Sequence, residues 1–72
     1  MAPRAERTYE LRVERQLGPA AAAHFPEFDV QHDGEGNTVL TGVLLDQAAL
    51  HGALARVRDL GLVLTEVRLV DG

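Results

Sequence analysis

Few side chains in this sequence could do chemistry, and the ones that suggest a site are Tyr9, Asp46 and His51. Aspartate, histidine and tyrosine can all transfer protons, so these three together could do general acid–base work. A simpler interpretation is that Asp46 caps a helix, because cap positions strongly select aspartate, and that His51 faces solvent. We favour the simpler interpretation and name no catalytic residue.

A metal or cofactor site is not expected. The three histidines, His24, His32 and His51, lack the short spacing to a second ligand that usually marks a metal site. The stretch Asp-Gly-Glu-Gly-Asn at residues 33–37 lacks the spaced oxygen ligands of a calcium loop, and a strand rather than a helix is expected after it. We therefore expect solvated or capping histidines and a hairpin turn at 33–37.

The residue types that are missing exclude several kinds of chemistry. The chain of 72 residues contains no Cys, Ser, Lys, Trp or Ile. The usual acyl-transfer nucleophiles, the Schiff-base lysine and the phosphate-binding lysine of Walker motifs are therefore absent. An enzymatic role is not excluded by these absences, but it is the less favoured reading.

Charge and hydropathy limit the classes of binding partner that we expect. The formal net charge is −4, and the arginines are scattered among carboxylates, which argues against nucleic-acid binding. No apolar run approaches the roughly 20 residues of a membrane span, and the first residues lack the apolar core of a secretory signal. We expect a cytoplasmic protein that meets neither nucleic acid nor membrane.

Hydrophobic periodicity and turn residues divide the chain into six elements. Alternation of apolar and polar residues predicts a half-buried first strand, and Asp46, an apolar stripe and Gly61 mark the start, face and end of the longer helix. The first helix is placed between Pro19 and Pro26, which open and stop it. We predict a flexible tail at 1–7 and one domain at 8–72, with strands at 8–14, 27–32, 38–44 and 62–70 and helices at 19–25 and 46–60.

The predicted fold class is α+β. Six elements in the order β-α-β-β-α-β are typical of a ferredoxin-like fold, with a four-stranded antiparallel sheet in the order 4-1-3-2 and two helices on one face. The inward-facing apolar positions define an expected core. We expect burial of Leu11, Val13, Phe28, Val30, Leu50, Leu54, Val57 and Val67.

Several stretches resemble a group of small, uncharacterised actinobacterial single-domain proteins. The similar stretches are Tyr-Glu-Leu-Arg-Val at 9–13, Thr-Val-Leu-Thr-Gly at 38–42, Asp-Gln-Ala-Ala-Leu-His-Gly at 46–52 and Arg-Asp-Leu-Gly-Leu at 58–62. The chain departs from this group before Phe25, where members often have tryptophans and this sequence has alanines. The resemblance implies a ferredoxin-like fold and a cytoplasmic bacterial origin, with no activity and no catalytic residues attached.

A short chain with three aromatic residues and no disulfide has a thin core, which favours oligomerisation. We expect a protein-interaction or regulatory module that forms a homodimer and meets a further protein. The candidate interface residues are Val39, Thr41, Leu62 and Leu64, and the register of residues 62–64 is left open. The alternative is a small-ligand binder or minor enzyme of the dimeric ferredoxin-like type, which a formed apolar pocket would favour.

Overall fold

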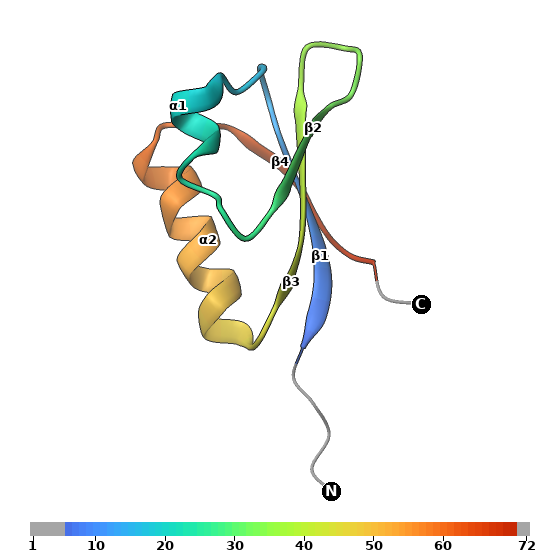
Figure 1. Ribbon diagram of the computed structural model, residues 1–72, viewed down its shortest axis with the longest axis vertical. Helices are drawn as coiled ribbons and strands as arrows, with labels where there is room; N and C mark the ends of the chain where they lie inside the picture. The colour runs from blue at the N-terminus through green and yellow to red at the C-terminus, as the bar shows by residue number, and fades with distance from the viewer. Residues whose placement is uncertain (1–5, 71–72) are drawn as a thin grey trace, which may run out of the picture.

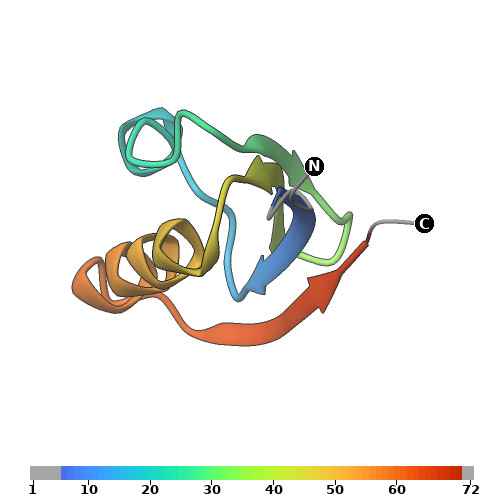
Figure 2. The same ribbon diagram turned by 90° about the horizontal axis from the view of Figure 1, so that it is seen from below.

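The computed structural model describes residues 6–70. Six elements follow one another in the order β-α-β-β-α-β, and Figures 1 and 2 show both helices on one side of a twisted sheet. The predicted tail falls mainly on residues 1–5, which lie outside the described residues, whereas its last residue, Arg7, already pairs in the sheet. The elements are β1 (Arg7–Val13), α1 (Pro19–Ala22), β2 (Asp29–His32), β3 (Thr38–Leu44), α2 (Gln47–Asp59) and β4 (Leu64–Leu69).

The sheet has four strands in the order β2-β3-β1-β4, and every neighbouring pair is antiparallel. Read from its other edge, this order has the same neighbours as the expected 4-1-3-2, with β4 beside β1. The central strand β1 alternates as predicted, since Leu11 and Val13 are fully buried on the helix side. Leu11 lies opposite Leu40 of β3, which is also fully buried. The middle of the sheet therefore anchors the core.

The hairpin between β2 and β3 forms as predicted, around the side chain of Asp33. Its Oδ1 accepts the backbone N–H groups of Glu35, at 2.7 Å, and Asn37, at 3.1 Å. These bonds, the one from Glu35 first, hold the pKa of Asp33 below its ordinary value. Gly34 and Gly36 have φ angles of 83° and 89°, which an L side chain rarely adopts.

The longer helix begins and ends where the sequence predicts. Asp46 Oδ1 accepts the Ala49 N–H at 2.8 Å, so Asp46 is the N-cap, and Gly61 follows the helix with φ 71°. The buried residues of α2 are Leu50, Ala53 and Val57.

The prediction that Leu54 is largely buried is wrong, because it is only half-buried. The stripe is centred on Ala53, which is fully buried, and Leu54 packs at the margin of the core. Val30, also expected in the core, is half-buried for the similar reason that β2 is an edge strand.

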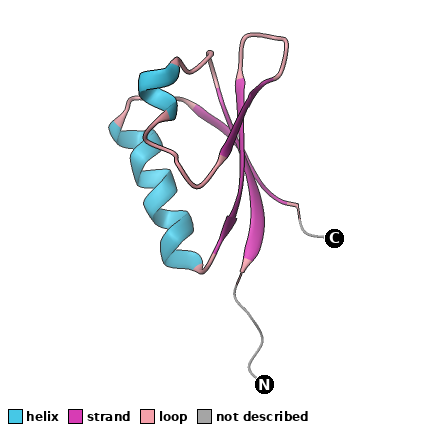
Figure 3. Cartoon of the chain, in the orientation of Figure 1, coloured by secondary structure: helices cyan, strands magenta, loops and turns pink. Residues whose placement is uncertain are grey.

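The first helix is much shorter than predicted. It comprises the single turn Pro19–Ala22, and the chain then reaches Phe25 and Phe28 through turns (Figure 3). The helix stops early because tertiary packing takes over. Phe25 is buried, with 1% of its surface exposed, and its ring meets Phe28 edge-on at 6.2 Å between centroids.

A buried hydroxyl shapes the connection from β1 to α1. Thr38 Oγ1 donates to the Arg15 carbonyl at 2.8 Å and accepts the Leu17 N–H at 3.1 Å. Arg15 has a φ of 75°, a left-handed conformation that costs energy for a residue other than glycine. Thr38 thus stabilises a strained turn from a fully buried position.

The expected inward burial of β4 is wrong. Val67 pairs with Leu11 and Leu69 with Tyr9, so both lie on the helix side of the sheet as expected, but Val67 is 43% exposed and Leu69 54% exposed. The cause is the placement of the helices: α1 is one turn, and α2 packs towards β3, while β4 runs away from it at the sheet edge (Figure 2).

Candidate functional site

The three candidate acid–base residues do not assemble into a site. The Asp46 carboxylate is engaged as the helix cap, and the Tyr9 hydroxyl accepts a hydrogen bond from Gln47 Nε2 at 3.1 Å. His51 is exposed one turn further along α2, and within residues 6–70 no hydrogen bond joins it to Tyr9 or Asp46. Tyr9 and Asp46 therefore lie near each other through Gln47, but the geometry positions no proton-transfer pair.

His51 instead lines a shallow hollow on the surface of α2. The hollow measures about 440 Å³ and is lined by His51, Leu54, Ala55 and Arg58. These residues are three and four positions apart, so they form one face of the helix. Their chemistry is mixed, with a cation and an imidazole beside a half-buried leucine.

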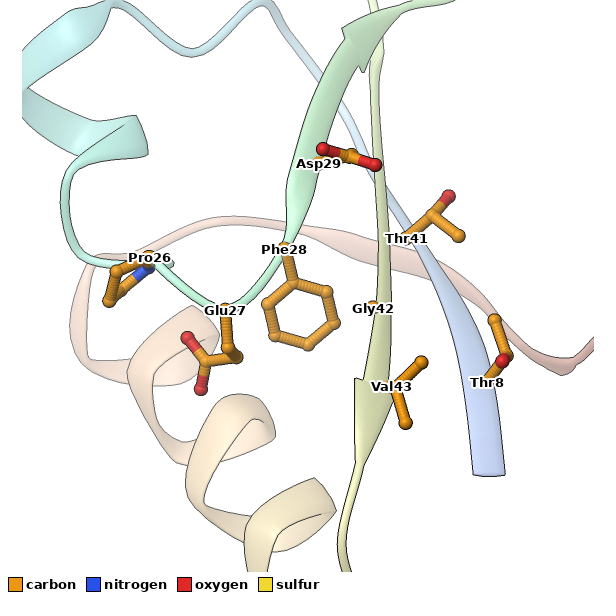
Figure 4. Close-up of a pocket in the computed structure, with 8 residues that line it drawn as sticks. All are labelled: Thr8, Pro26, Glu27, Phe28, Asp29, Thr41, Gly42 and Val43. Carbon is orange, nitrogen blue, oxygen red and sulfur yellow. The ribbon is translucent and has the colours of Figure 1, made fainter. Parts of the chain in front are cut away.

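A second hollow lies where β3 continues past the start of β2 (Figure 4). Its volume is about 430 Å³. Gly42 allows close packing beside this hollow, because a Cβ there would lie 2.7 Å from the Glu27 carbonyl oxygen and 2.8 Å from Phe28 Cδ1. The chain can therefore pack Phe28 directly on the β3 backbone. The lining residues are Thr8, Pro26, Glu27, Phe28, Asp29, Thr41, Gly42 and Val43.

Glu27, one of the two acidic residues that line this second hollow, is held by an arginine of α2. Both guanidinium Nη atoms of Arg56 donate to the Glu27 carboxylate, and Nη1 also donates to the His24 carbonyl at 2.6 Å. The guanidinium carbon lies 5.3 Å from the centre of the Phe25 ring. Arg56 thus ties α2 to the α1–β2 connection.

Electrostatics make Glu27 unsuited to act as a general acid. The hydrogen bond from Arg56 holds the pKa of Glu27 below its ordinary value, and partial burial opposes that effect more weakly. Glu27 and Asp29 flank Phe28 and point away from each other (Figure 4), so they do not form a carboxylate pair. Sequence reasoning places Arg56 in the last turns of the helix but misses its partner, because Glu27 is 29 residues away.

The Glu27–Arg56 pair predicts a pH-dependent stability. Because folding lowers the pKa of Glu27, its contribution is present above the ordinary value of 4.5 and is lost as the pH falls through the lower folded value. Glu27→Gln should cost about 0.5–1 kcal/mol at neutral pH, a modest value because the pair is partly exposed. In acid the two proteins should converge, as denaturant melts across the pH range will show.

Arg56→Gln provides the control for this prediction. In that background Glu27→Gln should change stability equally at all pH values, since the partner of the carboxylate is gone. A cost of Glu27→Gln that is the same in acid and at neutral pH in the wild-type background would contradict the assignment.

His24 and His32 are exposed like His51, and in the part of the chain that the structure describes no group of three His, Cys, Asp or Glu side chains is arranged to hold a metal ion.

The four expected interface residues fall on two different surfaces. Val39 and Thr41 are half-buried on the open face of the sheet, the side without helices, whereas Leu62 packs against the core and Leu64 lies at the start of β4. The open register of residues 62–64 is thereby resolved. Leu64 pairs with Val13 and lies on the helix side, 37% exposed.

The open face carries alternating charges beside Val39 and Thr41. Arg12 Nε lies 3.1 Å from Glu66 Oε1, and Arg68 Nη2 lies 3.6 Å from Glu10 Oε2. Arg12 also approaches Asp33 at 3.7 Å. A surface of this kind is compatible with water and is not an apolar docking face.

The helix side of β4 has the opposite character. Leu64, Val67 and Leu69 form an apolar row on an edge strand, and all are more than a third exposed. We call these three residues the β4 row. Sequence reasoning finds the inward direction of Val67 and Leu69 from the alternation but leaves that of Leu64 open, and it misses the exposure of all three because the cover depends on how far α1 and α2 reach.

Fold and surface together define a small α+β domain with a four-stranded antiparallel sheet, two helices on one side and an exposed apolar edge strand. The chain belongs to the family described as a domain of unknown function, DUF8691, whose model matches residues 8–68. No curated protein and no solved structure matches it. Neither helix within residues 6–70 has the length and apolar character needed to cross a membrane.

Proposed function

We propose that this protein is a small cytoplasmic interaction or regulatory module that associates with itself and has no catalytic activity of its own. The observation that carries the proposal is the β4 row. Three apolar side chains, 37%, 43% and 54% exposed, lie side by side on an edge strand. Exposed edges and apolar patches of this kind are usually covered in natural proteins.

The free energy that covering the β4 row would contribute supports a weak and reversible association. Full burial of a Val or Leu side chain contributes about 1.5–3 kcal/mol, so covering these partly exposed residues would contribute roughly 1 kcal/mol each. Six side chains in a dimer then give roughly 6 kcal/mol, comparable to the lower estimates, about 4 kcal/mol, of the cost of association. Backbone hydrogen bonds between two edge strands would add to this balance.

We assign the domain to the ferredoxin-like class. The element order and the strand neighbours support this assignment, and the single-turn α1 is its departure from the usual two full helices. The resemblance of residues 9–13, 38–42, 46–52 and 58–62 to small actinobacterial proteins supports a bacterial origin on the same terms.

A small-ligand or enzymatic role has less support. The two hollows, of about 430 and 440 Å³, are open depressions with polar and charged rims rather than enclosed apolar cavities. The Tyr9, Asp46 and Glu27 side chains are each engaged in hydrogen bonds that shape the fold.

Sedimentation equilibrium from micromolar to millimolar concentration tests the proposal. The wild type should rise from a mass of 7.8 kDa towards twice that value. Val67→Glu should remain monomeric because it places a charge in the β4 row. Val43→Glu is the matched control, because Val43 is 57% exposed on the open face and its substitution should leave association unchanged. A wild type that stays at 7.8 kDa throughout would overturn self-association.

A further inference from the structure

We propose that the free edge of β4 pairs antiparallel with β4 of a second copy, with Val67 at the two-fold axis, to give a continuous eight-stranded sheet. This inference rests on the proposed self-association and specifies its surface and register. It is argued from the backbone of β4, from the charges that flank Val67 and from the β4 row.

The backbone of β4 presents hydrogen-bonding groups outward at Val67 and Leu69. The Val70 N–H donates to the Thr8 carbonyl at 2.9 Å, so the backbone groups of Val70 point towards β1. In an antiparallel pair this direction alternates along the strand, which directs Arg68 and Glu66 towards β1 as well. The N–H and C=O groups of Val67 and Leu69 therefore face the free edge, ready for a further strand.

The charges on the open face favour an axis at Val67 over an axis at either neighbouring residue. With the axis at Val67, Glu66 lies opposite Arg68 of the second copy, and Arg68 lies opposite its Glu66. With the axis at Glu66 or at Arg68, two identical charges would face each other, which is destabilising. If the two-fold axis instead lay between two residues, the side chains of facing residues would lie on opposite faces of the sheet.

The pairs inside each copy extend this complementarity across the joint sheet. Glu66 is paired with Arg12 at 3.1 Å, and Arg68 with Glu10 at 3.6 Å. A row across the four central strands of the dimer then reads Arg12, Glu66, Arg68 of the second copy and Glu10 of the second copy. The charges alternate in sign along this row, and the two-fold axis generates a second, equivalent row.

The other edge and the open face fit a second copy less well. The β2 edge is only four residues long, Asp29–His32, and is mostly exposed and polar.

On the helix side, the axis at Val67 brings the two copies of Val67 together and places each Leu69 opposite Thr65 of the second copy. Val67 and Leu69 thereby gain neighbours from the second copy on both sides of the axis.

A charge-complementation experiment tests the register. Glu66→Arg alone and Arg68→Glu alone should each weaken self-association about tenfold, because each places like charges in both facing pairs. An equimolar mixture of the two variants should recover association as a heterodimer, since each facing pair is then of opposite sign. The same two molecules are compared alone and mixed, so any cost to their own folding cancels.

A cross-linking experiment gives a second readout. The chain contains no cysteine, so a single introduced one reports alone. Val67→Cys should form a disulfide-linked dimer under mild oxidation, since facing hydrogen-bonded residues have Cα atoms about 5.5 Å apart, within disulfide reach. Leu69→Cys is the control, because the two copies of residue 69 would be displaced by about 13 Å along the strands.

The outcomes separate this inference from the proposed function. Recovery in the mixture and linking at 67 but not at 69 support the edge pairing. A wild type that associates while the mixture behaves like the single variants, or while Leu69→Cys links as readily as Val67→Cys, overturns the edge pairing and leaves self-association through another surface. A wild type that is monomeric at every concentration overturns both.

Discussion

Phe25→Ala is expected to cost about 3–5 kcal/mol of unfolding free energy, the usual range for a buried phenylalanine. Phe25 is 1% exposed, meets Phe28 edge-on and lies under the Arg56 guanidinium. A domain of 72 residues has little stability to spare, so this variant should be largely unfolded at room temperature. Circular dichroism and a urea melt measure the effect.

Phe25→Leu is the control for this prediction, because it keeps most of the apolar volume and should lose much less. If Phe25→Ala melted like the wild type, Phe25 would not be the centre of the core, and the short α1 would need another explanation.

Thr38→Val is expected to cost about 2–4 kcal/mol although the side chain keeps its shape. The change removes the hydroxyl that satisfies the Leu17 N–H and the Arg15 carbonyl, and a buried polar group left without a partner costs about 1–3 kcal/mol. It also releases the left-handed turn at Arg15. Thermal melts compared at equal pH give the difference.

Thr41→Val makes the same chemical change three residues further along the same strand. Thr41 is half-buried and lies on the open face of the sheet. It should shift stability by no more than about 0.5 kcal/mol. Equal melting temperatures for Thr38→Val and Thr41→Val would contradict the role assigned to the Thr38 hydroxyl.

The elements that the sequence predicts best are those that depend on near neighbours. The alternation around Leu11 predicts β1 and its buried face, and the Asp33 turn predicts the hairpin. Asp46 and Gly61 predict the limits of α2 within one residue. For the hairpin and α2 the determining contacts lie within a few residues along the chain, and for β1 the alternation itself lies within the strand.

The features that the sequence does not predict depend on contacts between distant residues. The four alanines at 20–23 favour a longer helix, yet the helix ends after one turn and the chain continues to the buried Phe25. The hydrogen bonds of Thr38 join residues 21 and 23 positions apart, and the residues next to Thr38 in the chain do not predict them. The Glu27–Arg56 pair is hidden for the same reason.

The same limit applies to the candidate surface. Alternation gives Val67 the correct side of the sheet, but whether that side is covered is decided by the reach of two helices from elsewhere in the chain. The expected interface residues are therefore divided between two surfaces: Leu64 lies in the exposed apolar β4 row with Val67 and Leu69, whereas Val39 and Thr41 lie beside a charged surface.

Amide hydrogen exchange at Val67, followed as a function of protein concentration, tests most directly whether the β4 edge is the surface of self-association. The Val67 N–H faces the free edge of β4, away from β1, whereas the Arg68 N–H is directed at β1 and serves as the internal reference. We predict that exchange at Val67 slows as concentration rises while exchange at Arg68 does not follow it. Exchange at Val67 that stays at the rate of an open chain at every concentration would contradict the account.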